Sequence, residues 1–535
     1  MESKKLSFNW KMIKRDILRS WPIWVITSCF YLLLVTGLFS LMSYMDDDKD
    51  RIAGDLVRRF MLPVSGYISP ILGLIVGVYV FSYLSSKKKH HFYDFLPMSR
   101  MSMFATRFML GFIIMMIPSL VIYLVELLQA AIQTGYFLIA DLSAWLLINC
   151  ISNLFWLAFA TLFMVLCGSK IMAGICYVAF TFVGVILVYT LALFNSFMYI
   201  GFSSLGRVSN IDIINIGIFS PLEFIYDEGV LHGSGSWFNQ YFDIIKLLIV
   251  FVAFVILLVF SAHLYKKRLT ERTGDNIVFP LMKTICACVF TLMFTIEGTF
   301  FLIGITVYEQ EGLAHYSSYR ILIIAIIIVL GLLGYMIASM IIEKKFRVFK
   351  KNILKASIFT AIMVVFMILY MHDAFGIEKY VPEENEVDTV GVTSGQFMSE
   401  SVYSYVQYDY DNDDYIYPTT MSDENKEVII GLHQMIIDNM DEVIESYKNI
   451  DESYYNSIYG DYDFEEYSRN VKPVRSCVVY FTYYVKNESM YREYYIKPEG
   501  KLFEQVKAYL KAHPETFRKG DSEPNYYYEY MKTIQ

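Results

Sequence analysis

The stretch from Arg320 to Ile342, "RILIIAIIIVLGLLGYMIASMII", decides the fold class, because no charged residue follows Arg320 within it. A helix that crosses a bilayer needs about 20 mostly apolar residues. Eight further runs of this kind occur, and 56% of the chain is apolar. The nine runs lie near residues 21–43, 62–84, 104–128, 142–167, 171–194, 244–265, 284–307, 320–342 and 353–371. The sequence therefore predicts a mainly α, polytopic membrane protein with about nine transmembrane helices.

The distribution of Lys and Arg between these runs predicts the orientation, because basic loops resist translocation across the membrane. With a cytoplasmic N-terminus, the loops on the cytoplasmic side hold 23 Lys and Arg residues, and the opposite loops hold 7. We therefore expect a multi-pass protein of the cell membrane with its N-terminus in the cytoplasm. Nine spans then place the C-terminal portion outside the cell.

The composition of the chain changes after the ninth run. Residues 373–535 are rich in Tyr and contain 32 Asp and Glu against 15 Lys and Arg. Nucleic-acid binding is not expected of such a domain, because phosphates require a basic surface. The predicted organisation is an amphipathic cytoplasmic helix in residues 1–20, a six-helix transmembrane core in 21–265, three further transmembrane helices in 266–372, and an acidic extracellular domain in 373–535.

Two patterns predict an α+β fold for the extracellular domain. The stretches "CVVYFTYYV" and "MYREYYI" flank "KNES", which is the pattern of a strand, a turn and a second strand. Leu432, Ile436 and Val443 mark the apolar face of a helix, and "KLFEQVKAYLKAH" after Gly500 predicts another.

The N-terminal segment has the pattern of a helix that lies on the membrane surface. Trp10, Ile13 and Ile17 recur at helical spacing, with Lys11 and Lys14 largely on the other face. Such a helix lies in the membrane interface with its apolar face inward. The alternative is that the basic residues only keep the N-terminus in the cytoplasm, and both interpretations are compatible.

The sequence offers no catalytic set. The phosphate-binding pattern G-x-x-x-x-G-K-[ST] is absent, and the single Gly-Lys pair, at Gly500, is followed by Leu. We therefore expect no enzyme activity, no cofactor and no P-loop ATP site in this chain. A metal site is not expected either: His90 and His91 are flanked by lysines, and Cys286 and Cys288 lie in an apolar run without a second pair.

One charge near the middle of a predicted span is a candidate functional residue. Glu297 lies in the seventh run, and burying an ionisable group in a membrane is costly, so such groups commonly face a bundle interior or a cavity. The alternative is a protonated or hydrogen-bonded glutamic acid that only joins packed helices.

The loop "KKKHHFYDFLPMSR", residues 87–100, holds more than a charged membrane edge requires. Phe92, Phe95 and Leu96 stand at helical spacing and would form a compact apolar surface before Pro97 ends the helix. Ser99 can cap the helix that follows. The lysines suffice for topology, so the exposed apolar group predicts a protein-docking element.

The string "SKKKHHFYDFLPMSRMSMFATRFMLGF" resembles the loop between the second and third spans in permease subunits of bacterial ABC-2 type ABC transporters, a group common in Gram-positive organisms. The stretches "ERTGDNIVFP" and "IIEKKFRVFKKNILKASIF" are similar to the same group, as is the C-terminal strand pair. The resemblance implies that a separate cytoplasmic ATPase subunit hydrolyses ATP and grips a coupling helix. That helix would be formed by Phe92, Tyr93, Asp94, Phe95 and Leu96.

The resemblance further implies that residues 7–20 form an elbow helix and that the permease pairs with a second copy or with a different permease subunit. Membrane lipid is the remaining expected partner. Two alternatives stay open: a non-transporting membrane sensor that displays the acidic domain, and an ion-coupled secondary transporter with Glu297 as the carrier. The substrate and the direction of transport do not follow from the sequence.

Overall fold

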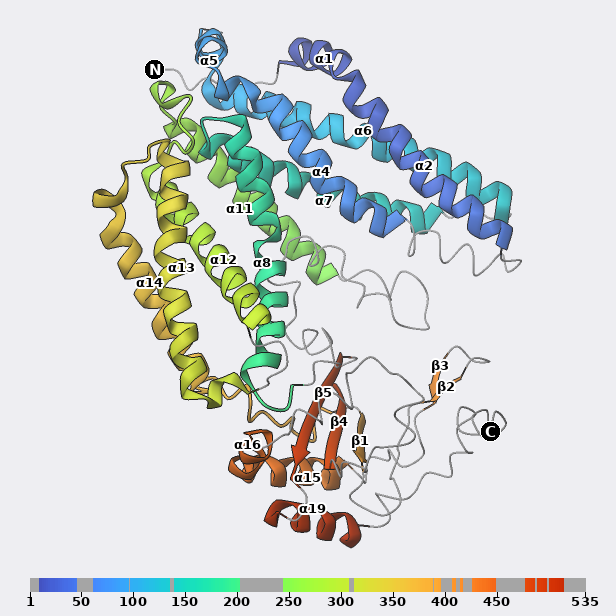
Figure 1. Ribbon diagram of the computed structural model, residues 1–535. Coiled ribbons are helices and arrows are strands. Elements are labelled where there is room, and N and C mark those ends of the chain that lie inside the picture. Colours follow the sequence, from blue (N-terminus) through green and yellow to red (C-terminus); the bar gives the residue numbers. More distant parts are fainter. Residues whose placement is uncertain are drawn as a thin grey trace, which may run out of the picture. The chain divides into compact units, whose positions relative to one another are not determined.

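A computed structural model describes the chain in residues 9–45, 61–95, 97–134, 139–202, 244–306, 312–387, 389–395, 407–409, 414–416, 426–448, 477–485, 488–497 and 500–513 (Figure 1). In these residues, helices coincide with the nine apolar runs. They are α2 (Trp21–Met45), α4 (Leu62–Phe81), α6 (Arg100–Thr134), α7 (Ile139–Leu166), α8 (Lys170–Met198), α11 (Ile244–Lys267), α12 (Pro280–Thr306), α13 (Ser317–Glu343) and α14 (Phe349–Met371).

Short helices precede or connect these long ones. They are α1 (Trp10–Arg19), η2 (Ser82–Ser85), α5 (Lys87–Asp94), η6 (Thr270–Arg272) and η7 (Leu313–His315). Seven described helices are long and apolar enough to cross a membrane, or nine spans if each of two bent pairs counts as one. The bends are 58° between α1 and α2, and 44° within α8. The prediction of a mainly helical, multi-pass membrane protein is thus confirmed.

The chain divides into two compact units. The first comprises Met1–Ile186, Ile216–Met293 and Leu333–Leu354, and the second comprises Leu187–Asn215, Phe294–Leu332 and Lys355–Gln535. Helices α8, α12, α13 and α14 therefore contribute residues to both units.

Helix α7 is central to the first unit, where it packs against α4, α6 and α11. Small residues allow α4 to approach it closely: a Cβ added at Gly77 would lie 2.6 Å from Cβ of Ala160, and one at Gly73 would lie 2.9 Å from Cβ of Trp156. Close backbone approach through small residues is a common way for membrane helices to pack. Substituting either glycine would push the two helices apart.

Buried polar side chains join the helices of the first unit around Asn149 of α7. Its Nδ2 donates to Ser65 of α4 at 3.1 Å, and its Oδ1 accepts from Ser119 of α6 at 3.2 Å. Trp145, one turn earlier in α7, donates to the same Ser65 oxygen at 2.9 Å. Interhelical hydrogen bonds of this kind stabilise packing where apolar burial gives no preference between protein and lipid.

The second unit contains a three-stranded antiparallel sheet in the order β1-β4-β5 (Figure 1). Its strands and helices, with a separate two-stranded sheet, are β1 (Thr389–Gly395), β2 (Gln407–Asp409), β3 (Asp414–Ile416), α15 (Lys426–Asp438), α16 (Met440–Lys448), β4 (Cys477–Val485), β5 (Glu488–Ile496) and α19 (Lys501–Ala512). Strands β4 and β5 form the hairpin expected from the sequence, with Cys477 opposite Ile496.

Alternate residues of β4 and β5 bury one face of the sheet in a shared core. Phe481 and Tyr494 lie there with Leu432 of α15 and Val506 of α19. His433 is fully buried in this core, with its Nδ1 2.7 Å from the hydroxyl of Tyr483 and its Nε2 2.9 Å from that of Tyr494. A neutral imidazole satisfies both contacts, since one nitrogen donates and the other accepts.

The end of α8 also belongs to this core. Ile200, which is 1% exposed, lies in the same buried cluster as Phe481, and the amide of Glu493 donates to the carbonyl of Gly201 at 3.1 Å. Gly201 has a φ of +91°, and a Cβ there would lie 2.5 Å from the ring of Tyr494. Only glycine fits this close approach.

Buried charges hold the same junction. Glu378, 3% exposed, accepts from the amide of Ile200 at 2.9 Å and lies 2.8 Å from Nε2 of His315. Arg492 of β5 donates to the carbonyl of Ile377 at 3.0 Å, and its guanidinium lies 3.9 Å from the ring centroid of Phe202. Burial lowers the pKa of Arg492. The C-terminal sheet and the ends of the helices in this unit are therefore packed together.

Acid is expected to destabilise the C-terminal domain through His433. Burial holds the pKa of this imidazole well below its ordinary value, so the folded domain does not bind the proton that the unfolded chain binds below about pH 6.5. The stability that the neutral His433 contributes to the folded domain is fully present above that pH. Below it, the free energy of unfolding falls by up to about 1.4 kcal/mol per pH unit. Pulse proteolysis of the full chain between pH 5 and 7.5 measures this loss.

The variant H433Q should abolish this component of the pH dependence, whereas H513Q should retain it, because His513 is only partly buried. An unchanged pH profile in H433Q would contradict the assignment.

Candidate functional site

Helix α5 occupies the connection between α4 and α6 and is the most distinctive candidate site of the first unit. Lys87, Lys88 and Lys89 are exposed at its start, and it ends at Asp94. Ser99 then accepts from the amide of Ser102 at 3.1 Å, which is the predicted cap of α6. Of the predicted coupling residues, Phe95 follows the last helical turn, and Leu96 lies outside the described residues.

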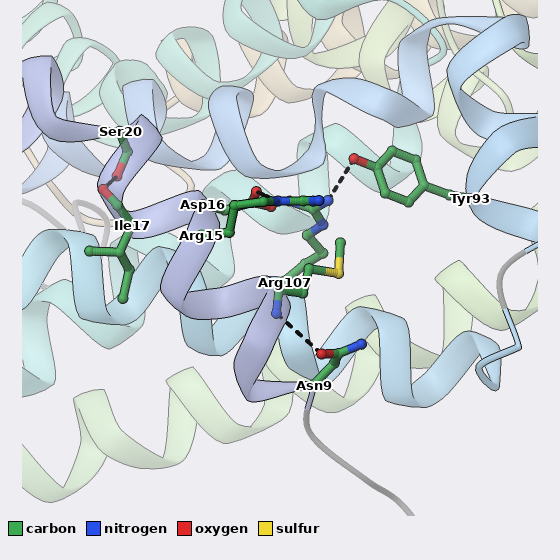
Figure 2. Close-up of polar contacts among 8 residues, drawn as sticks. Asn9, Arg15, Asp16, Ile17, Ser20, Tyr93 and Arg107 are labelled. Atoms are coloured by element: carbon green, nitrogen blue, oxygen red, sulfur yellow. Dashed lines mark hydrogen bonds and ion pairs between the residues drawn. The ribbon is translucent and has the colours of Figure 1, made fainter.

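A buried arginine fixes this short helix to its neighbours (Figure 2). Arg107 of α6 donates through Nη2 to the hydroxyl of Tyr93 at 2.7 Å and through Nη1 to Oδ2 of Asp16 in α1 at 3.0 Å. The side chains of Arg107 and Asp16 are 6% and 9% exposed. One guanidinium therefore joins α1, α5 and α6.

Aromatic contacts strengthen the same attachment. The guanidinium of Arg107 lies 4.9 Å from the ring centroid of Tyr93, and that ring lies 4.7 Å from the ring of Tyr83 in η2. A cation over an aromatic face is worth about 2 kcal/mol when both groups are desolvated. The side chain of Tyr93 therefore faces inward and attaches α5 to its neighbours. The sequence did not predict this orientation, because it grouped Tyr93 with the exposed coupling residues.

The two phenylalanines that flank Tyr93 face the other way. Phe92 is 63% exposed and Phe95 is 86% exposed. An apolar pair on a short polar helix, held in place by buried contacts, is the kind of surface that binds a partner. The sequence identified this pair, but it missed Arg107 and Asp16. Arg107 could have been noticed in the sequence as an isolated charge just inside an apolar run, since such a charge needs a buried partner.

A second buried arginine supports the base of this site. Arg268, directly after α11, donates to the carbonyls of Met164 at 2.8 Å, Val165 at 2.7 Å and Leu84 at 2.9 Å. These carbonyls lie at the C-terminal ends of helices, where they have no amide partner within the helix and where cations are favoured. Burial lowers the pKa of Arg268 to about 10, so its guanidinium stays charged at neutral pH. It fixes η2, which leads into α5.

Helix α1 forms where an elbow helix was predicted, with Asn9 accepting from the amide of Met12 at 3.1 Å as its cap (Figure 2). Its apolar residues do not share one environment. Ile13 is 1% exposed and Ile17 is partly buried, whereas Trp10 is 62% exposed. Ile13 packs inward, and Trp10 remains available to the membrane interface, where tryptophan is favoured.

Glu297, the intramembrane candidate, lies near the middle of α12 and accepts from the hydroxyl of Thr190 in α8 at 2.5 Å. The first unit contains a matching pair, because the hydroxyl of Thr36 in α2 donates to Glu126 of α6 at 2.5 Å. The structure thus pairs each glutamate with a threonine of another helix, which agrees with a role in helix packing.

No candidate metal site is found in the part of the chain that the structure describes. No group of three or more His, Cys, Asp or Glu residues that could hold a metal ion occurs there. Comparisons with known proteins add no relative: no family model, no curated protein and no solved structure matches the chain. The function must therefore be argued from the site itself.

The two arginines that contact Asp16 give a matched pair of variants. R107Q is expected to destabilise the α1–α5–α6 contact by about 3 to 5 kcal/mol, because it removes the buried partner of Asp16 and leaves that carboxylate only the exposed Arg15. R15Q should cost well under about 1 kcal/mol, because Arg15 is 62% exposed. Trypsin cleavage at Lys87–Lys89 in the purified protein reports whether α5 is released. Equal cleavage of the two variants would show that Arg107 does not hold α5.

Substitutions at Glu297 test its packing role. E297Q keeps a hydrogen-bond acceptor for Thr190 and is expected to leave the folded yield unchanged. E297K places a cation near the bilayer centre at a cost of roughly 2.5 to 3.5 kcal/mol and should reduce that yield. Size-exclusion chromatography in detergent measures both. A loss of transport in E297Q with intact folding would instead support the secondary-transporter alternative.

Proposed function

We propose that this chain is the transmembrane permease subunit of an ABC transporter of the ABC-2 type. It would move its substrate across the cell membrane using ATP hydrolysed by a separate ATPase subunit. The single observation that supports this proposal best is the orientation of α5: Phe92 and Phe95 are exposed while Tyr93 is tied to Arg107. The resemblance of residues 86–112 to the corresponding permease loop agrees with it.

The proposed mechanism uses α5 as a coupling helix. The ATPase would bind Phe92 and Phe95 in an apolar cleft, so that its closure on ATP moves α5. Because Arg107 links α5 to α1 and α6, the movement reaches α6 and the helix that leads into α2. A rigid, buried connection is required for such transmission, since a loose loop would absorb the displacement.

This proposal includes the orientation inferred from the loop charges. The N-terminus, α1 and α5 would face the cytoplasm, and the acidic C-terminal domain would face outward. The functional unit would be a homodimer or a pair of different permease subunits. No ATP would bind to this chain, because the P-loop pattern is absent from its sequence.

Two alternatives keep specific observations in their favour. A membrane sensor would use the C-terminal domain as its receptor, and Ile200 gives that domain a core residue from the end of α8. An ion-coupled transporter would use the Glu297–Thr190 pair. Neither explains the exposed phenylalanines of α5.

Docking on α5 is tested with exposed residues whose loss should leave the fold intact. F95A is expected to weaken retention of the ATPase by about 2 kcal/mol or more, because an aromatic anchor in a partner's cleft commonly contributes that much. K88A should change retention by well under about 1 kcal/mol. Co-purification from native membranes, followed by mass spectrometry of P-loop ATPases, measures both.

Membrane insertion should be normal in F95A and K88A. Equal retention of the ATPase in the two variants, or the absence of any P-loop ATPase, would refute the proposal. An inverted topology in K88A would show that the loop is only a charged stop.

A further inference from the structure

A second phenylalanine of the first unit is as exposed as Phe95, the residue that follows α5. Phe346, between α13 and α14, is 89% exposed, and Phe95 is 86% exposed. Among the described residues, no other large apolar side chain is more than 83% exposed. Apolar side chains of the membrane-spanning helices contact lipid tails, but neither of these phenylalanines lies in a helix. The exposure of Phe346 therefore needs its own explanation.

Specific bonds hold the connection that carries Phe346. Lys344 has a φ of +55°, and its Nζ donates to the carbonyl of Gly274 at 2.8 Å. Nδ2 of Asn276 donates to the carbonyl of Ile341 at 2.5 Å, and Val348 is buried at 2% exposure. The connection is thus fixed on both sides of Phe346, and the ring is presented outward by a defined turn.

The α13–α14 connection is short, and this keeps Phe346 close to the membrane surface. Helix α13 ends at Glu343 and α14 begins at Phe349, and both are long and apolar enough to cross a membrane. Five residues between two spans cannot carry Phe346 far from the boundary of the bilayer. The connection that contains α5 is longer, because residues 86–99 lie between the two neighbouring spans.

Exposed cations lie on both sides of Phe346 in the chain. Lys345, Arg347 and Lys350 are exposed, and none has an acidic partner among the residues that the structure describes. The nearby carboxylate of Glu343 is already occupied, because it accepts from Lys351 at 3.1 Å and from Asn352 at 3.3 Å. The cations around Phe346 are therefore free to bind an external anion.

We propose that the α13–α14 connection is a binding site for anionic phospholipid. Lys345, Arg347 and Lys350 bind the headgroup phosphates, and the ring of Phe346 enters the boundary between headgroups and acyl chains. Basic residues at this level are attracted to anionic lipid, and an aromatic ring is favoured there. The site does not depend on the function proposed above, because it requires no ATPase.

The test uses the full-length protein in nanodiscs with equal amounts of phosphatidylglycerol and phosphatidylcholine. The variants F346W and F95W form a matched pair of nearly equal exposure, and each tryptophan signal is obtained by subtracting that of the parent protein. Either phosphatidylglycerol or phosphatidylcholine carries brominated chains, which quench a tryptophan that they contact. The F346W signal is expected to be quenched, and more strongly by brominated phosphatidylglycerol. The F95W signal should be quenched by neither.

Charge removal tests the headgroup contact. Each basic residue near an anionic surface strengthens binding about fivefold, so K345Q/R347Q/K350Q in the F346W background should weaken phosphatidylglycerol binding on the order of a hundredfold. Quenching by the two lipids should then become equal. The matched triple variant K87Q/K88Q/K89Q, on α5, should leave the lipid preference unchanged.

Two results would overturn the proposal. If the two brominated lipids quench F346W equally in the parent background, the site does not select anionic lipid. If neither lipid quenches F346W, the ring does not reach the membrane, and the connection is better explained as a contact for a protein partner.

Discussion

Unpaired backbone polar groups cannot be left in the hydrocarbon of a bilayer, and this constraint organises the whole chain. The long apolar segments meet it as α-helices, whose amides and carbonyls pair within each segment. Two threonines of these helices also pair within their own segment: Thr27 and Thr291 donate to the carbonyls of Ile23 and Ala287, four residues earlier. At helix ends the carbonyls lose their partners within the helix, and Arg268 donates to such carbonyls.

The two buried arginines, Arg107 and Arg268, stabilise the site in different ways. Arg268 donates to backbone carbonyls of Met164, Val165 and Leu84, so it completes the hydrogen bonding of helices that have ended. Arg107 instead joins two side chains, Asp16 and Tyr93, from separate helices. The first arrangement stabilises a helix terminus, and the second fixes the position of a short helix. Together they explain why α5 is held firmly although it lies outside the spans.

In the C-terminal domain, the boundary given by the change in composition differs from the boundary of the hydrophobic core. Its acidic residues distinguish positions 373–535 from the rest of the chain, yet its core includes Ile200 from the end of α8. The buried Glu378 accepts from the amide of Ile200, and the guanidinium of Arg492 lies over Phe202. These contacts are buried, so the sheet and these helix ends share one packed region.

The helices, the β4–β5 hairpin and the apolar pair Phe92 and Phe95 could be predicted from the sequence, because hydrophobic runs, alternation and helical spacing are local patterns. The contacts between distant residues could not be predicted in this way. Asp16 and Arg107 lie 91 positions apart, and Thr36 and Glu126 lie 90 apart. The tertiary structure also turned Tyr93 inward and placed Ile200 in the C-terminal core. Such pairings depend on how whole helices pack, and no local period in the chain encodes that packing.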